Sequence, residues 1–171
     1  KLNRTTSTTT SDGDSYLYSY TGDGQLTCHA ALSVLDAKRF YEKWLQDIAD
    51  GQDQLSGHVQ YTAPYIRSGG GPGGWGCAIV EVPYQLYKHY GDKEKLLKYY
   101  GNMRRYIDYL EAHSEFGLVT SDKAGEWCLG DWCGPNILYP KKDITNHNQQ
   151  VFLSLLLYIQ YQKLFVLHLQ I

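Results

Sequence analysis

The chain has 171 residues, a length typical of one globular domain with its own hydrophobic core. Hydrophobic residues make up 43% of it, charged residues 20%, and the formal net charge is -2. This composition gives no electrostatic signal for nucleic acid or for an anionic membrane, so we expect neither partner. No signal peptide or membrane span is predicted either, because polar side chains interrupt the longest apolar run, at 151–171.

Residues 1–15 are rich in Ser and Thr and predict a flexible N-terminal segment, which leaves 16–171 as one domain. Apolar residues then recur at helical spacing over 24–35 and again over 37–50. Gly51 is placed to end the second helix. The apolar stripe expected to face the core from the first helix consists of Leu26, Ala30, Ala31, Val34 and Leu35.

A long connection containing Pro64 and many glycines, 52–74, separates this helix pair from the next. A third helix is predicted over 75–91, with a kink at Pro83. A fourth is predicted over 93–113, with Asp92 as its N-cap.

A second long connection, 114–142, precedes a last helix that starts near Thr145 or Asn146. The pattern is about five helices joined alternately by short turns and long loops. It predicts an all-α fold of helical hairpins with the long loops at one end, where functional groups would gather.

Asp23, at the entrance to the first helix, allows two interpretations. It is either an ordinary helix N-cap or a carboxylate that binds hydroxyl groups of a ligand beside an aromatic ring. Trp75 follows the glycine-rich run 69–74 and either fills a core or presents its ring to a ligand. No Lys-Ser or Lys-Thr pair follows these glycines, which argues against a phosphate-binding loop. The segment 126–132 places two aromatic and two acidic residues in one loop and favours a ligand-facing role.

The 16 Tyr and 4 Trp residues suit either a carbohydrate site or an aromatic helical core. The six histidines are scattered without metal-ligand spacing, and the cysteines fit no zinc pattern, so no metal or cofactor is predicted. The cysteines are interpreted as small buried hydrophobic residues, with a disulfide between the last two left open: Cys28, Cys77, Cys128 and Cys133.

Several stretches together resemble bacterial α-L-rhamnosidases, inverting glycoside hydrolases with an (α/α)6 barrel. Their order and spacing match over about 12–140: YTGDGQ at 20–25, FYEKWLQDI at 40–48, GHV at 57–59, TAP at 62–64, GGGPGGWG at 69–76, YKHYGD at 87–92 and WCLGDWC at 127–133. The resemblance implies a partial (α/α)6 toroid, about half of the barrel, with a rhamnose-containing saccharide or glycoside as the ligand.

The resemblance also implies roles for individual residues. Asp23 falls on a carboxylate that binds rhamnose hydroxyls, Tyr20 on an aromatic that lines the pocket, and Trp75 on a Trp that packs against the sugar. The remaining implied pocket residues lie in the later loop: Trp127, Asp131 and Trp132.

Two departures from the family pattern bear on catalysis. The family's general acid is a Glu shortly before the position of Tyr20, whereas here the nearby carboxylic acids are Asp12 and Asp14. Either is a candidate replacement, and Asp14 is the one assigned to the catalytic site. The family's general base comes from the later half of the barrel, and only Asp143 follows Pro140 as a carboxylate. We therefore expect little or no turnover by the chain alone, and self-association through helix faces that a full barrel would cover. The alternative is a non-catalytic carbohydrate-binding or assembly module.

Overall fold

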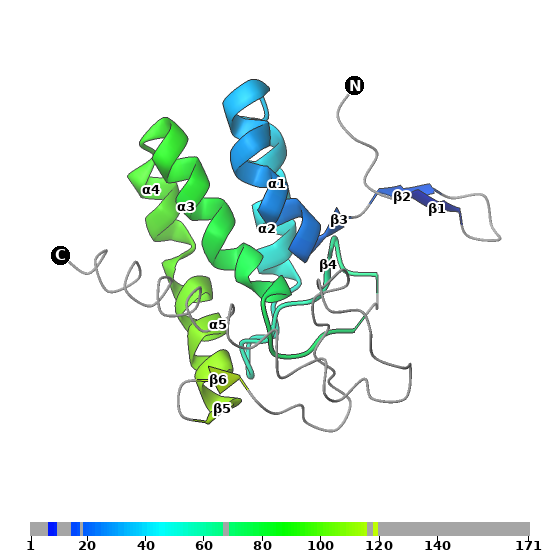
Figure 1. The fold of residues 1–171 in the computed structure, drawn as a ribbon, viewed down its shortest axis with the longest axis vertical. Coiled ribbons are helices and arrows are strands. Elements are labelled where there is room, and N and C mark those ends of the chain that lie inside the picture. The colour runs from blue at the N-terminus through cyan, green and yellow to red at the C-terminus, as the bar shows by residue number, and fades with distance from the viewer. Residues whose placement is uncertain (1–6, 10–14, 18, 67–68, 116–117, 120–171) are drawn as a thin grey trace, which may run out of the picture.

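The computed structural model describes residues 7–9, 15–17, 19–66, 69–115 and 118–119 (Figure 1). Within these ranges the structure is mainly helical, as the sequence predicts. The helices are α1 (Thr21–Val34), α2 (Lys38–Asp50), the short 3-10 helix η1 (Trp75–Cys77), α3 (Ala78–Tyr90), α4 (Lys93–Lys98) and α5 (Tyr100–Ala112).

Three short antiparallel strand pairs accompany the helices in the part of the chain that the structure describes. They are β1 (Ser7–Thr9) with β2 (Ser15–Leu17), β3 (Ser19–Tyr20) with β4 (Thr62–Ala63), and β5 (Ser114–Glu115) with β6 (Leu118–Val119). The pair β3–β4 matters most for function, because it joins the start of α1 to the middle of the first long connection, with Tyr20 opposite Thr62.

The helices pack as antiparallel hairpins. Figure 1 shows α1 and α3 side by side, with α2 behind α1, and α3 contacts α1, α2 and α4. This arrangement confirms the predicted all-α hairpin architecture. The predicted last helix and most of the second long connection lie outside the described residues.

The helix boundaries follow local sequence signals. Asp92 caps α4 as predicted, because its carboxylate accepts a hydrogen bond from the backbone N–H of Lys95 at 3.1 Å. Gly91 ends α3 in the left-handed conformation, with φ of 69°, which only glycine adopts at little cost. The third helix continues through Pro83, and the predicted fourth helix is divided at Tyr99 into α4 and α5.

The predicted core-facing stripe of α1 is wrong. Leu26 is 82% exposed and Val34 is 76% exposed, whereas the buried side of the helix carries Gln25, Cys28 and Leu32. Long-range contacts at the start of α1 set its rotation, and they turn Gly22 and Gly24 inward. An apolar strip of α1 is therefore left on the outside of the described structure.

Cys28 and Cys77 are fully buried free thiols. Burial raises the pKa of Cys28 to about 12, with a smaller contribution from the Glu81 carboxylate, and the same two causes raise the pKa of Cys77 well above its ordinary value. Both thiols stay protonated and pack as small hydrophobic groups, which confirms their interpretation. No helix among the described residues is long and apolar enough to cross a bilayer.

Candidate functional site

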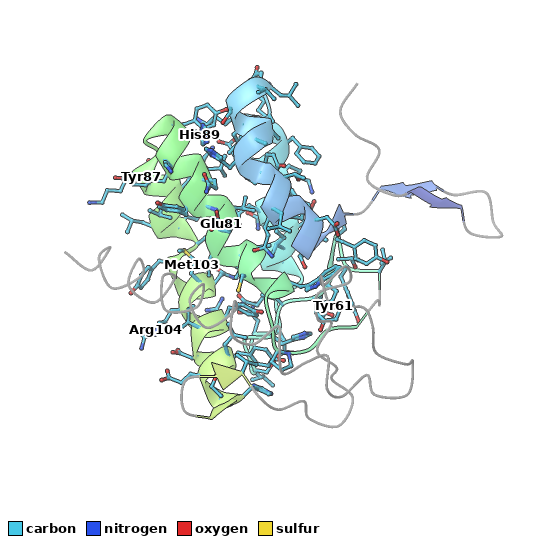
Figure 2. The ribbon with its side chains drawn as sticks, in the orientation of Figure 1. Tyr61, Glu81, Tyr87, His89, Met103 and Arg104 are labelled. Atoms are coloured by element: carbon cyan, nitrogen blue, oxygen red, sulfur yellow. The ribbon has the colours of Figure 1, made fainter. Side chains whose placement is uncertain are left out.

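Three aromatic rings gather at the N-terminal end of α1. The ring centroids of Tyr20 and Trp75 lie 5.5 Å apart in an edge-to-face arrangement, and those of Tyr61 and Trp75 lie 5.4 Å apart. Tyr20 is 37% exposed, Trp75 is half-buried, and Tyr61 is buried. Figure 2 marks Tyr61 beside this end of the helix. The cluster therefore has a buried base and a partly exposed aromatic surface.

The start of α1 is tied to the loop that carries Tyr61. The backbone N–H of Thr21 donates to the carbonyl of Tyr61 at 2.8 Å, and the Thr21 hydroxyl donates to the same carbonyl at 3.1 Å. Gly22 then lets Trp75 approach, since a Cβ at this position would lie 2.9 Å from the indole ring. The backbone hydrogen bond of Thr21 and the lack of a side chain at Gly22 together let Trp75 pack against the first turn of α1.

Two buried polar side chains, one from α1 and one from α5, hold the glycine-rich loop. Gln25 donates through its amide to the carbonyls of Gly74, at 2.7 Å, and Trp75, at 3.2 Å. From α5, the hydroxyl of Tyr106 donates to the carbonyl of Gly73 at 2.5 Å. These contacts fix the backbone on both sides of the point where the Trp75 ring emerges.

Asp23 is the third residue of α1, and Tyr20 occupies the N-cap position without a side-chain cap. The N-cap interpretation of Asp23 is therefore wrong. Its side chain is exposed and forms no hydrogen bond or ion pair within the described ranges. Asp23 lies in the first turn of α1, three residues after Tyr20.

The other predicted site residues lie outside the described residues: Asp14, Trp127, Asp131 and Trp132. Sequence reasoning assigned no role to Tyr61, Gln25 or Tyr106. Gln25 belongs to the YTGDGQ stretch, so the family resemblance could have marked it as a site residue. Tyr61 and Tyr106 lie in other segments, and no motif around either residue indicates a role.

This arrangement suits a polyhydroxylated ligand. An exposed carboxylate accepts hydrogen bonds from ligand hydroxyls, and adjacent aromatic rings offer apolar surface to C–H groups. The described residues thus provide binding chemistry at the start of α1.

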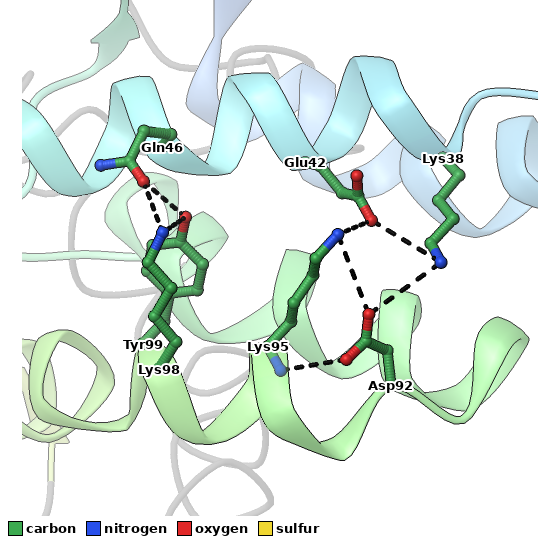
Figure 3. A network of polar contacts seen from close by, with 7 residues as sticks. All are labelled: Lys38, Glu42, Gln46, Asp92, Lys95, Lys98 and Tyr99. Carbon is green, nitrogen blue, oxygen red and sulfur yellow. Dashed lines mark hydrogen bonds and ion pairs between the residues drawn. The ribbon is translucent and has the colours of Figure 1, made fainter.

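A separate hollow of about 460 Å³ lies between α2 and α4, lined in part by Arg39, Gln46 and Leu86. Figure 3 shows that most of its polar groups already bind each other. Lys95 pairs with Glu42 and, at 3.8 Å, with Asp92. The Lys98 ammonium and the Tyr99 hydroxyl both donate to the side-chain oxygen of Gln46. We assign this network to holding α2 against α4, with a small effect on stability because its members are solvent-accessible.

Gln25→Leu is expected to lower the free energy of unfolding by about 1–2 kcal/mol, because it removes two hydrogen bonds to loop carbonyls. Gln25→Glu should cost at least as much at neutral pH, since an ionised carboxylate cannot donate to those carbonyls. Urea unfolding of both variants is the measurement. A Gln25→Glu protein as stable as the parent would contradict the role of this amide.

Residues 4–165 match the family described as the bacterial alpha-L-rhamnosidase 6 hairpin glycosidase domain. Because this match spans almost the whole chain, the chain belongs to that family of helical glycosidase domains. An alpha-L-rhamnosidase of Streptomyces avermitilis is 36% identical over 109 residues, which are 63% of this chain and 10% of the relative.

Solved structures agree with this assignment. The alpha-L-rhamnosidase from Dictyoglumus thermophilum has a TM-score of 0.69 and 27% identity, over 88% of this chain and 16% of that one. The Streptomyces avermitilis alpha-L-rhamnosidase complexed with L-rhamnose has a TM-score of 0.61 and 28% identity, over 88% of this chain and 15% of that one. These similarities confirm the partial six-hairpin fold, and the chain spans only a small part of each relative.

Proposed function

We propose that the chain forms the first part of the catalytic domain of an α-L-rhamnosidase, which in its complete form hydrolyses terminal α-L-rhamnose with inversion. The observation that carries the proposal is the exposed carboxylate of Asp23, which has no side-chain partner among the described residues and follows Tyr20 by three residues, where the Tyr20 ring meets Trp75. Family membership and the similarity to a relative solved with L-rhamnose support it.

In this proposal Asp23 accepts hydrogen bonds from sugar hydroxyls, and the rings of Tyr20 and Trp75 cover an apolar face of the sugar. Trp127, Asp131 and Trp132 complete the pocket. Asp14 protonates the leaving oxygen in place of the family's Glu.

Inverting hydrolysis needs two carboxyl groups about 6.5–9.5 Å apart, with a water molecule between one of them and the sugar. We propose that the general base comes from a later part of the barrel, outside these 171 residues. The chain alone is then expected to bind L-rhamnose and to release little or none from an aryl rhamnoside.

The absence of a Glu just before Tyr20 favours a second candidate, a non-catalytic carbohydrate-binding or assembly module. A chimera separates the two candidates. Residues 4–165 would replace the matching segment of the Streptomyces avermitilis enzyme, and release of rhamnose and binding of L-rhamnose would both be measured. Release that is lost on Asp14→Asn supports the catalytic proposal. A folded chimera that binds L-rhamnose without releasing it supports the binding module, and one that does neither contradicts both.

The outward strip of α1 predicts self-association of the isolated chain. Leu26 and Val34 are exposed on the face opposite the core, and apolar surface of this kind favours contact with another apolar face. We expect light scattering to give a mass above that of one chain, and Leu26→Lys with Val34→Lys to restore the monomer. A clean monomer for the parent chain would contradict this prediction.

A further inference from the structure

Two histidines that are 60 residues apart in the sequence meet between α1 and α3. Nδ1 of His29 and Nε2 of His89 form a hydrogen bond of 3.0 Å, in which one ring nitrogen donates and the other accepts, and the ring centroids lie 5.1 Å apart. His29 is exposed and His89 is half-buried near the end of α3, where Figure 2 marks it on the side toward α1. Solvent therefore reaches a pair of ring nitrogens held by two different helices.

This separation suits two neighbouring ligands of one metal ion. Imidazole nitrogen binds zinc and similar ions at about 2.0–2.1 Å, so nitrogens 3.0 Å apart would subtend an angle of about 95° at the ion. Such an angle lies between the square-planar or octahedral value and the tetrahedral one. A metal ion would replace the proton that the two nitrogens share in their hydrogen bond, and both rings would turn so that their lone pairs point to the ion.

A third donor lies one helical turn before His89. Gln85 is 7% exposed, and its amide nitrogen donates to the carboxylate of Glu81 at 2.7 Å, which fixes the orientation of the amide. The remaining amide oxygen is buried and has no hydrogen-bond partner among the described residues. Because residues four apart share a helix face, Gln85 lies one turn before His89 on the same side of α3.

We propose that His29 and His89 form a binding site for a divalent transition-metal ion that joins α1 to α3, with the amide oxygen of Gln85 as a third ligand and water molecules completing the shell. Two imidazoles favour Ni²⁺, Cu²⁺ or Zn²⁺ over Mg²⁺ or Ca²⁺, which prefer oxygen ligands. Among the described residues, no three His, Cys, Asp or Glu side chains lie so that they could hold a metal ion together, so this site depends on the amide and on water.

Only the folded chain brings the two rings together, so metal binding should stabilise it. Calorimetry of the untagged chain with Ni²⁺ is expected to give one ion per chain, and the melting temperature is expected to rise with Ni²⁺ concentration. Mg²⁺ at the same concentrations should leave the melting temperature unchanged.

His29→Gln and His89→Gln are the decisive variants. Glutamine keeps a hydrogen-bonding group between the helices but removes an imidazole ligand, so each variant should fold and bind Ni²⁺ at least about tenfold more weakly. Gln85→Leu should weaken binding by less than either His variant. A variant with Cys128→Ser and Cys133→Ser should keep the parent affinity, which excludes thiol binding as the source of the signal.

The results expected with and without the metal site differ. Loss of Ni²⁺ affinity and of thermal stabilisation in both His variants, with retention in the cysteine variant, supports the site. Parent-like affinity in either His variant, or a melting temperature that does not respond to Ni²⁺, overturns it.

Discussion

Gly24→Ala is expected to lower the free energy of unfolding by about 3 kcal/mol, the upper part of the usual range for overpacking a core. A Cβ at this position would lie 2.2 Å from the ring of Trp44, well inside van der Waals contact. That ring cannot move aside easily, because it is 4% exposed and its indole N–H donates to the carbonyl of Ala63 at 3.1 Å. Relief of the clash would have to separate α1 from α2.

Helix propensity acts in the opposite direction. Replacing a helical glycine by alanine gains about 1 kcal/mol when the site is open, so the clash must exceed this gain for Gly24→Ala to destabilise. Gly101→Ala on α5 isolates the propensity effect, because that glycine is exposed and the nearest atom, on Arg105, is 3.7 Å away. We expect Gly101→Ala to stabilise slightly.

Gly22→Ala is the second matched control. Its Cβ would meet the ring of Trp75 at 2.9 Å, but this ring is half-buried and can shift. We expect a small loss of stability and a displaced Trp75. Urea unfolding of the three variants tests the order, with Gly24→Ala clearly the least stable. Equal stability of Gly24→Ala and Gly101→Ala would show that Trp44 does not restrict this position.

The helices of the described region were predictable because their signals are local. Apolar spacing, the cap at Asp92 and the stop at Gly91 act within a few residues, and they place α2, α3 and the start of α4 to within a few positions. One helix was expected across Tyr99, because the apolar pattern of α4 continues into α5 and no proline interrupts it. Gly101, two residues after the division, is the local signal that this pattern outweighed.

The face of α1 was not predictable from spacing because distant residues decide it. Thr21 binds the carbonyl of Tyr61, and Gly24 packs on Trp44, so the small residues of α1 turn inward and Leu26 turns outward. Predicting a helix face from apolar periodicity assumes that the largest hydrophobic residues face the core. This assumption fails for α1, because two tryptophans pack closely against its glycines.

The same difference between local signals and contacts of distant residues applies to the candidate site. The proximity of Tyr20 to Trp75 was expected only through the family resemblance, since 55 residues separate them. Tyr61 and Tyr106 support this contact from other segments, and no motif in their own surroundings marks them. Sequence reasoning reached the residues that face outward and missed the ones that position them.

Asp23→Asn is expected to weaken binding of L-rhamnose about 100-fold, in the isolated chain and in the chimera alike. Asparagine keeps the size of the side chain but removes its charge. Two hydrogen bonds from sugar hydroxyls to a carboxylate then become weaker neutral ones, a loss of about 2.8 kcal/mol. Calorimetry with L-rhamnose measures the change.

The control is Asp36→Asn, which removes another exposed carboxylate just beyond the other end of α1 and should leave the affinity unchanged. The stability of Asp23→Asn should fall by about 0.5 kcal/mol or less, because an exposed acidic residue in the first turn interacts only weakly with the helix dipole. Lost binding in a folded protein then reports on the ligand contact itself. If Asp23→Asn binds L-rhamnose as tightly as Asp36→Asn does, the carboxylate of Asp23 does not hold the sugar, and the ring pair at the start of α1 is a structural cluster.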